Sequence, residues 1–178
     1  MEERFQTYTT VLTLLNSLAN LPNGQSATSS VGIWGHSNGG HIALAILEIS
    51  KRNYPTVLWA PVSKPFPFSI LFYADELSDK GKALRKLIAD FENEYDVNKY
   101  SVDNYFDMIN APIEVHQGLD DQEVPYWWSD ELVQILLYKN KDVEYFKYPL
   151  QNHNFNAGSW DILATRTLNF YLRQFSIQ

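Results

Sequence analysis

The sequence predicts an α/β fold, a mostly parallel sheet with helices on both faces. Short apolar segments typical of strands alternate with helix-like segments along most of the chain, and such alternation is typical of parallel strands joined by crossover helices. Residues 31–40, with the sequence VGIWGHSNGG, form a short apolar strand pattern that runs directly into a helix pattern. At 178 residues, the chain is long enough to bury the core of one domain.

The first elements follow from periodicity and turn residues. Apolar residues at helical spacing predict an amphipathic helix over residues 5–18. A polar loop is expected over 21–30, and a strand over 31–34. The helix expected over 41–50 is apolar on all sides at its centre, so it should be buried. The next strand is expected over 56–60.

Residues 62–110 interrupt this alternation. An aromatic run is followed by a segment, 77–94, with the apolar stripe of a helix. We interpret 62–110 as a helical cap inserted over the carboxyl edge of the sheet, because long insertions in compact domains are usually functional. The alternative is a helix packed on the flank of the sheet.

The last part of the chain returns to the alternating pattern. Strands are expected over 112–116 and 143–148, and helices over 131–138 and 160–175. Neither an internal repeat nor a low-complexity tract divides the sequence. We therefore expect residues 1–178 to form a single domain.

Composition excludes several classes of function. The net charge is −7 and no basic stripe is present, which argues against nucleic-acid binding. The sequence has no run of about 20 apolar residues for a membrane span. Cysteine is absent, so disulfides, a thiol nucleophile and a thiolate zinc site are excluded. The acidic start lacks a signal-peptide pattern, which favours a cytoplasmic location, or secretion if a leader has been lost.

Ser37 stands at the centre of a Gly-x-Ser-x-Gly motif between a strand and a helix, the context of a nucleophile elbow. Such a serine is held in a strained turn with its hydroxyl exposed above the sheet. Gly35 and Gly39 are expected where a Cβ atom would collide with a neighbouring element. The following helix directs the positive end of its dipole at the serine, and the backbone N–H of Asn38 is the expected oxyanion donor.

A serine hydroxyl needs a base, and the base needs an orienting acid. Residues 118–125, GLDDQEVP, follow a predicted strand and offer three acids. Asp121 is favoured because Gly-x-x-Asp-x-x-Val-Pro suits a tight turn followed by a chain reversal. Asp120 is more easily explained as a turn residue that caps backbone amides, and Glu123 as a solvated side chain.

His153 is the expected base, because it directly follows the last predicted strand and gives the chain order Ser, Asp, His. His36 lies beside the serine and is expected to pack against the site or line it. His41 falls inside a buried helix and suits a structural role. His116 could reach the cleft but precedes the acid. A calcium loop built from the acids near Asp121 lacks the EF-hand spacing, so no metal is expected.

Four segments carry a resemblance to a known family: GIWGHSNGGHIAL at 32–44, LWAPVS at 58–63, GLDDQEVPY at 118–126 with Trp-Ser at 128–129, and Tyr-Pro followed by His-Asn-Phe within 148–155. Together they resemble the prolyl oligopeptidase-type (dienelactone hydrolase-like) catalytic domain of the α/β-hydrolases, over most of 31–175. The resemblance implies Ser37, Asp121 and His153 as a catalytic triad that hydrolyses peptides or carboxylic esters without a cofactor.

The front of the chain departs from the family. Family members have several strands and an oxyanion loop before the elbow strand, whereas here a single helix is expected. The resemblance therefore implies an N-terminally shortened domain, whose elbow strand would be a sheet edge. Because an open edge invites pairing, we expect a homodimer or a partner that completes the sheet.

These observations predict a serine hydrolase, with a carboxylesterase favoured over a peptidase and a small ester or peptide as substrate. An aromatic cap would shape an apolar substrate pocket. The pocket candidates are His36, Trp59, Phe66, Phe68, Phe72 and Tyr126. The alternative is a weak or silent hydrolase-fold module that acts as a dimer or binds a partner. The missing second oxyanion donor motivates it, since losing one such donor lowers kcat by about 10²–10³.

Overall fold

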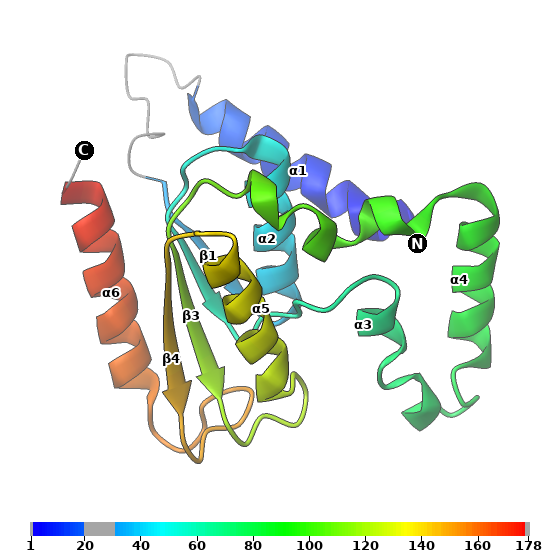
Figure 1. Cartoon of the computed structure of the whole chain (residues 1–178). Helices are drawn as coiled ribbons and strands as arrows, with labels where there is room; N and C mark the ends of the chain where they lie inside the picture. Colours follow the sequence, from blue (N-terminus) through cyan, green and yellow to red (C-terminus); the bar gives the residue numbers. More distant parts are fainter. Residues whose placement is uncertain (1, 20–30, 177–178) are drawn as a thin grey trace.

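The computed structural model describes residues 2–19 and 31–176, with side chains described for 5–18 and 31–176. Its centre is a four-stranded parallel sheet in the order β1-β2-β3-β4 (Figure 1). The strands are β1 (Ile33–His36), β2 (Thr56–Trp59), β3 (Ile113–Gly118) and β4 (Val143–Tyr148). The predicted α/β class with a parallel sheet is confirmed. The polar loop predicted for 21–30 lies outside the described residues.

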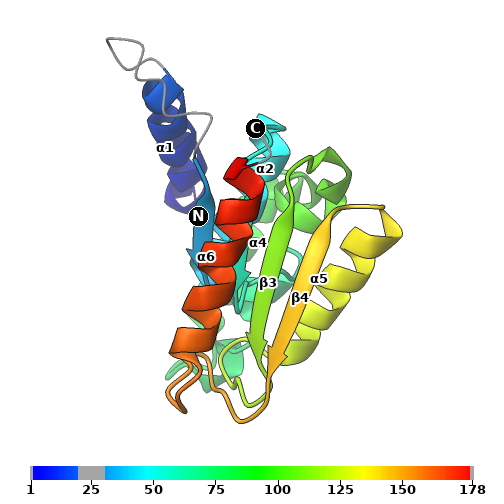
Figure 2. The ribbon, with the colours of Figure 1, turned by 90° about the vertical axis from the view of Figure 1, so that its left-hand side faces the viewer.

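Four longer helices surround the sheet: α1 (Glu2–Ala19), α2 (Asn38–Ser50), α5 (Tyr126–Tyr138) and α6 (Trp160–Ser176). Helices α2 and α5 lie on one face and α6 lies along the other, as Figures 1 and 2 show. Helix α1 packs against α2 on the side away from the strands. The prediction of helices on both faces is therefore confirmed.

The larger core fills the space between the sheet and helices α1, α2 and α5. Leu44, Ile46 and Leu47 of α2 are fully buried there against side chains of β2 and β3. This agrees with the expectation that the helix after the elbow is buried. A second cluster, which includes Trp59, Trp128 and Phe155, lies toward the carboxyl ends of the strands. It includes residues from the segments that follow β2, β3 and β4.

Several element boundaries differ from the sequence expectation. The helix expected from 77 begins at Lys82, α2 begins at Asn38 rather than at 41, and β3 ends at Gly118 rather than at 116. Two further differences have identifiable reasons. Strand β1 covers Ile33–His36, rather than 31–34, because Gly35 and His36 pair with Leu58 and Trp59 of β2. Helix α5 begins at Tyr126, well before residue 131, because Pro125 provides its N-cap. Proline has no backbone N–H, and this costs nothing at the start of a helix, where the N–H would have no partner within the helix.

Residues 62–110 form a helical insertion that projects sideways from the sheet (Figure 1). It contains α3 (Phe68–Leu71), α4 (Lys82–Glu94) and four short 3₁₀ helices, η3 (Ala74–Glu76), η4 (Val97–Tyr100), η5 (Val102–Asn104) and η6 (Phe106–Met108). Near α3, the Tyr73 hydroxyl donates to the Gln122 carbonyl over 2.6 Å. In contrast, α4 packs on α1 through Phe91 and Phe5, whose ring centroids are 5.7 Å apart. Its role as a cap stays a prediction.

The strand that carries the elbow lies at an edge of the sheet. In the described part of the chain, β1 pairs with β2 alone. Among the residues that the structure describes, no helix is long and apolar enough to cross a membrane.

Candidate active site

Ser37 occupies the turn between β1 and α2 with a backbone conformation that is rare for a residue with a side chain, φ 56° and ψ −121°. Such a conformation is strained and persists only where neighbouring structure holds it. Here the Ser37 N–H donates to the Trp59 carbonyl over 2.9 Å, and the Val62 N–H donates to the Ser37 carbonyl over 3.0 Å. The exit of β2 therefore fixes the elbow through the backbone.

The glycines around Ser37 do not all act as the sequence suggested. A Cβ atom on Gly35 would lie 2.5 Å from the carbonyl oxygen of Gly39, so the close approach of strand and helix requires this glycine. The expectation for Gly39 is wrong, because a Cβ atom there would meet nothing within 4 Å. The tight position is Gly40 instead, where a Cβ atom would lie 2.6 Å from the Pro61 side chain.

A buried carboxylate–imidazole pair lies on the loops after β3 and β4. The Nδ1 atom of His153 donates to Oδ2 of Asp121 over 2.8 Å, and both side chains are almost completely buried. The other oxygen of Asp121 accepts from the backbone N–H groups of Glu123 and Val124, at 2.9 and 2.8 Å. With Nδ1 protonated, Nε2 of the neutral imidazole is left as an acceptor.

Gln117 is a supporting residue that the sequence reasoning missed. Its amide nitrogen donates to Oδ2 of Asp121 over 3.1 Å, and its amide oxygen accepts from the Ser129 hydroxyl over 2.7 Å. Gln117 and His153 therefore both donate to the same oxygen of the Asp121 carboxylate. The available signal was a polar residue near the end of the strand that precedes Asp121, followed by the Trp-Ser pair at 128–129.

The two neighbouring acids occupy different positions. The Asp120 side chain is exposed, and its backbone N–H donates to the Gln151 carbonyl over 3.0 Å. Glu123 is also largely exposed, but one of its carboxylate oxygens lies 3.9 Å from Nε2 of His153. Of the three acids, Asp121 is the one that hydrogen-bonds to His153.

The remaining histidines have separate structural contacts. His36 stacks on Trp59 with ring centroids 3.8 Å apart, and its Nε2 donates to the His153 carbonyl over 3.2 Å. Burial, with a smaller contribution from the charge of His153, lowers the pKa of His36. His41 is buried in α2, where its ring nitrogens bond to the Tyr8 hydroxyl and to the Val62 carbonyl. This is the structural role expected for it.

His116 is fully buried inside the sheet and does not extend into the site. Its ring nitrogens bond to Glu114 over 2.8 Å and to the Tyr148 hydroxyl over 2.7 Å. Both ring nitrogens are therefore occupied by structural partners.

Ser37 and Asn38, the predicted nucleophile and oxyanion donor, lie at the amino end of α2. Asn38 is the first residue of this helix, so its N–H lies at the positive end of the helix dipole. The Ser37 hydroxyl makes no side-chain hydrogen bond within the described residues. Long or absent nucleophile–base bonds are common in enzymes without substrate.

The predicted pocket residues fall into three places. His36 and Trp59 lie next to His153. Phe68 and Phe72 contact Trp128 of α5, and Tyr126, 42% exposed, begins that helix. Phe66 instead packs against Phe5 and Phe91, between α1 and α4. A substrate-lining role for these residues stays a prediction.

In residues 2–19 and 31–176, no group of three or more His, Asp or Glu side chains has the arrangement of a metal site. The hydrogen-bonded pair of His153 and Asp121 has the arrangement expected of a base and its orienting acid. This is a set of groups for proton transfer.

A parallel sheet, a strained serine between strand and helix, and a buried Asp–His pair together define an α/β-hydrolase fold with a nucleophile elbow. The model of the prolyl oligopeptidase family matches residues 18–178. The chain therefore belongs to this family. No curated protein matches it in sequence.

Solved structures share the fold at low sequence identity. Dipeptidyl peptidase 4 from Porphyromonas gingivalis is 20% identical, with a TM-score of 0.73, over 93% of this chain and 22% of that one. A puromycin-hydrolyzing peptidase from Mycobacterium tuberculosis is 22% identical, with a TM-score of 0.71, over 92% and 24%. Esterase B from Lactobacillus rhamnosis is 17% identical, with a TM-score of 0.65, over 98% and 61%. The chain thus spans about a quarter or less of the two peptidases.

Proposed function

We propose that this chain is a serine hydrolase that cleaves carboxylic esters, in preference to short peptides, through an acyl-enzyme. The observation that carries the proposal is the buried hydrogen bond between Asp121 and His153 beside a strained elbow serine. The peptidases and the esterase named above support the hydrolase class but differ in substrate. Esters are favoured because they make the smallest demand on a site with one identified oxyanion donor.

In the proposed mechanism, the Ser37 oxygen attacks the carbonyl carbon while Nε2 of His153 accepts the hydroxyl proton. Asp121 holds Nδ1–H and stabilises the imidazolium that forms. His153 then passes the proton to the leaving alcohol as the acyl–oxygen bond breaks. Water repeats the sequence on the acyl-enzyme, which releases the acid and regenerates the Ser37 hydroxyl.

Negative charge develops on the carbonyl oxygen during both attacks. The Asn38 N–H at the start of α2 is the donor in position to stabilise it. His36 is proposed to position the base, because it bonds to the backbone of His153 and is itself stacked on Trp59.

Hydrolysis of p-nitrophenyl acetate and butyrate by the purified chain tests this proposal, with Ser37→Ala as the control. Activity that disappears in the control supports the proposal. Equal rates in both proteins contradict it. A matched dipeptide p-nitroanilide separates the two substrate classes, and faster cleavage of the anilide would contradict the preference for esters.

One observation favours a second candidate, a silent hydrolase-fold module that binds a partner. A carboxylate oxygen of Glu123 lies 3.9 Å from Nε2 of His153, and no hydrogen bond joins this nitrogen to Ser37 within the described residues. A serine-reactive phosphonate distinguishes the two candidates, because an assembled triad gives a covalent adduct on Ser37. Absence of the adduct would favour the silent module.

We also propose that the exposed edge of β1 pairs with a second copy or with a partner chain. The Trp34 side chain in β1 is 44% exposed, and an unpaired edge presents free N–H and C=O groups. Sedimentation at increasing protein concentration tests the homodimer. A single monomeric species at every concentration argues against it.

A further inference from the structure

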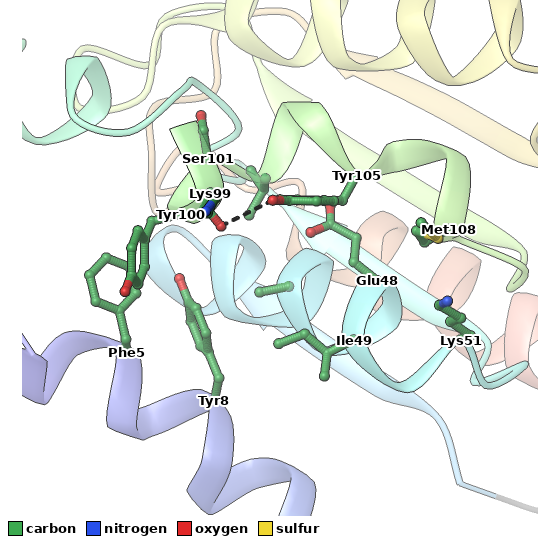
Figure 3. Close-up of a pocket in the computed structure, with 12 residues that line it drawn as sticks. Phe5, Tyr8, Glu48, Ile49, Lys51, Lys99, Tyr100, Ser101, Tyr105 and Met108 are labelled. Carbon is green, nitrogen blue, oxygen red and sulfur yellow. Dashed lines mark hydrogen bonds between the residues drawn. The ribbon is translucent and has the colours of Figure 1, made fainter. Parts of the chain in front are cut away.

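A pocket of about 400 Å³ lies on the opposite side of α2 from the strands, away from the triad. Its walls come from α1, from α2 and from the 3₁₀ helices η4 to η6 of the insertion (Figure 3). Phe5, Tyr8, Tyr100 and Tyr105 supply aromatic rings to these walls. Pockets of this size, apolar with few polar groups, are typical of sites for small molecules.

The Glu48 carboxyl is the exceptional group in this pocket. Glu48 is only 6% exposed, and its Oε1 atom is buried without a hydrogen-bond partner. Figure 3 shows its side chain extending from α2 toward Tyr105, between the walls of the pocket. A buried carboxyl without a partner carries a free-energy cost, which a ligand with a suitable donor would remove.

Three hydroxyl groups near Glu48 already have hydrogen-bond partners. The Tyr8 hydroxyl bonds to His41 over 2.8 Å, and the Tyr105 hydroxyl donates to the Lys99 carbonyl over 3.3 Å. The Ser101 hydroxyl donates to Asp103. Within the described parts of the chain, no side chain forms an ion pair or a hydrogen bond with Glu48. Among the side chains of these walls, Glu48 is therefore the one with a buried polar atom that lacks a hydrogen-bond partner.

Charge favours a cation as that partner. The nearby Asp103 carboxylate adds negative potential, and together with burial it raises the pKa of Glu48 to about 9, burial being the larger cause. The two lysines that line the pocket, Lys51 and Lys99, belong to its exposed rim. Aromatic faces beside a carboxyl also attract a cation through their ring quadrupoles.

We propose that this pocket binds a small apolar amine, whose ammonium group donates to the Glu48 carboxyl while its hydrocarbon part packs on Phe5, Tyr8 and Tyr100. At neutral pH, Glu48 holds its proton in the empty pocket. Binding of the ammonium ion makes the carboxylate the favoured form, so this proton passes to the buffer. The site is separate from Ser37 and does not depend on the proposed hydrolysis.

Calorimetric titration of the full chain with benzylammonium chloride at pH 7 tests the proposal, with benzyl alcohol as the neutral probe of similar shape. We expect benzylammonium to bind at least about tenfold more tightly. Titration in two buffers of different ionisation enthalpy should show release of about one proton per bound cation. Equal affinity for the two probes without proton release, or no saturable binding of either, would overturn the proposal.

Variants identify the source of the proton among the titratable groups that face Glu48, which are Asp103, Lys51, Lys99 and the tyrosines of the walls. Glu48→Gln keeps the shape of the side chain and should abolish proton release and weaken benzylammonium binding at least about tenfold. Glu92→Gln, an exposed change on α4, should bind like the parent chain. Ser37→Ala should also bind normally, which separates this site from the hydrolase. Unchanged binding in Glu48→Gln contradicts the assignment.

Discussion

Asp121→Asn tests the proposed triad with the smallest change in shape. In the structure, Oδ1 of Asp121 accepts from two backbone N–H groups. The amide oxygen of asparagine must take this place, because an amide nitrogen there would face two donors. The amide nitrogen then occupies the Oδ2 position, where it faces the donors of His153 and Gln117.

This arrangement reverses the tautomer of His153. Nδ1 must become the acceptor, so the proton moves to Nε2, which can no longer accept from Ser37. In another serine hydrolase with this triad, the same change lowers kcat by about 10⁴, which corresponds to about 5.4 kcal/mol of transition-state stabilisation. We expect a loss of kcat of this size for ester hydrolysis, with a smaller effect on KM.

The assay is steady-state hydrolysis of p-nitrophenyl butyrate at pH 7.5, with thermal unfolding as a check on the fold. Asp120→Asn is the matched control, since the Asp120 side chain is exposed and its backbone makes the bond to Gln151. It should retain parent activity. A loss of less than about tenfold in Asp121→Asn would refute the assignment and direct attention to Glu123, which lies 3.9 Å from Nε2 of His153.

Three further variants have expected effects on stability, each measured by urea unfolding. Gly35→Ala places a Cβ atom 2.5 Å from a backbone oxygen of α2 and should lower the free energy of unfolding by about 3 kcal/mol; parent-like stability would contradict the close approach. Tyr148→Phe leaves a buried nitrogen of His116 without its partner at 2.7 Å and should cost about 1–3 kcal/mol, whereas Tyr138→Phe, at an 87% exposed position, should change little. Burial raises the pKa of Glu48 from 4.5 to about 9, so ionisation of this carboxyl lowers the free energy of unfolding increasingly across that pH range and not below it. The Glu48→Gln variant should therefore lose less stability than the parent between pH 5 and pH 9. An unchanged pH dependence of stability would argue against a buried neutral carboxyl.

Local signals in the sequence were sufficient for the framework of the fold. The alternation of apolar strands and helices predicted the parallel sheet, and the boundaries of β4 agree with the expected 143–148. Boundaries were less accurate where a pairing partner decides them. The partners Leu58 and Trp59 extend β1 through Gly35 and His36, although glycine and histidine resemble the start of a turn.

Local signals in the sequence also predicted part of the candidate site. Ser37, Asp121 and His153 each follow a strand, so their residue types and chain order place all three at the carboxyl edge of the parallel sheet. Gln117 was missed because its contact with Asp121 depends on the three-dimensional path of the loop after β3. Glu48 was missed because the approach of α1 and the insertion, both distant in sequence, creates the pocket around it.

The position of β1 at the sheet edge bears on how the proposed site would respond to heat or denaturant. This strand has four residues and, in the described chain, one neighbouring strand, whereas β3, which leads to Asp121, has six residues and a strand on each side. Edge elements open by local fluctuations that need less free energy than global unfolding. Ser37, the proposed nucleophile, thus follows a strand that should open more easily than β3, and we expect any hydrolysis to stop before the helices unfold.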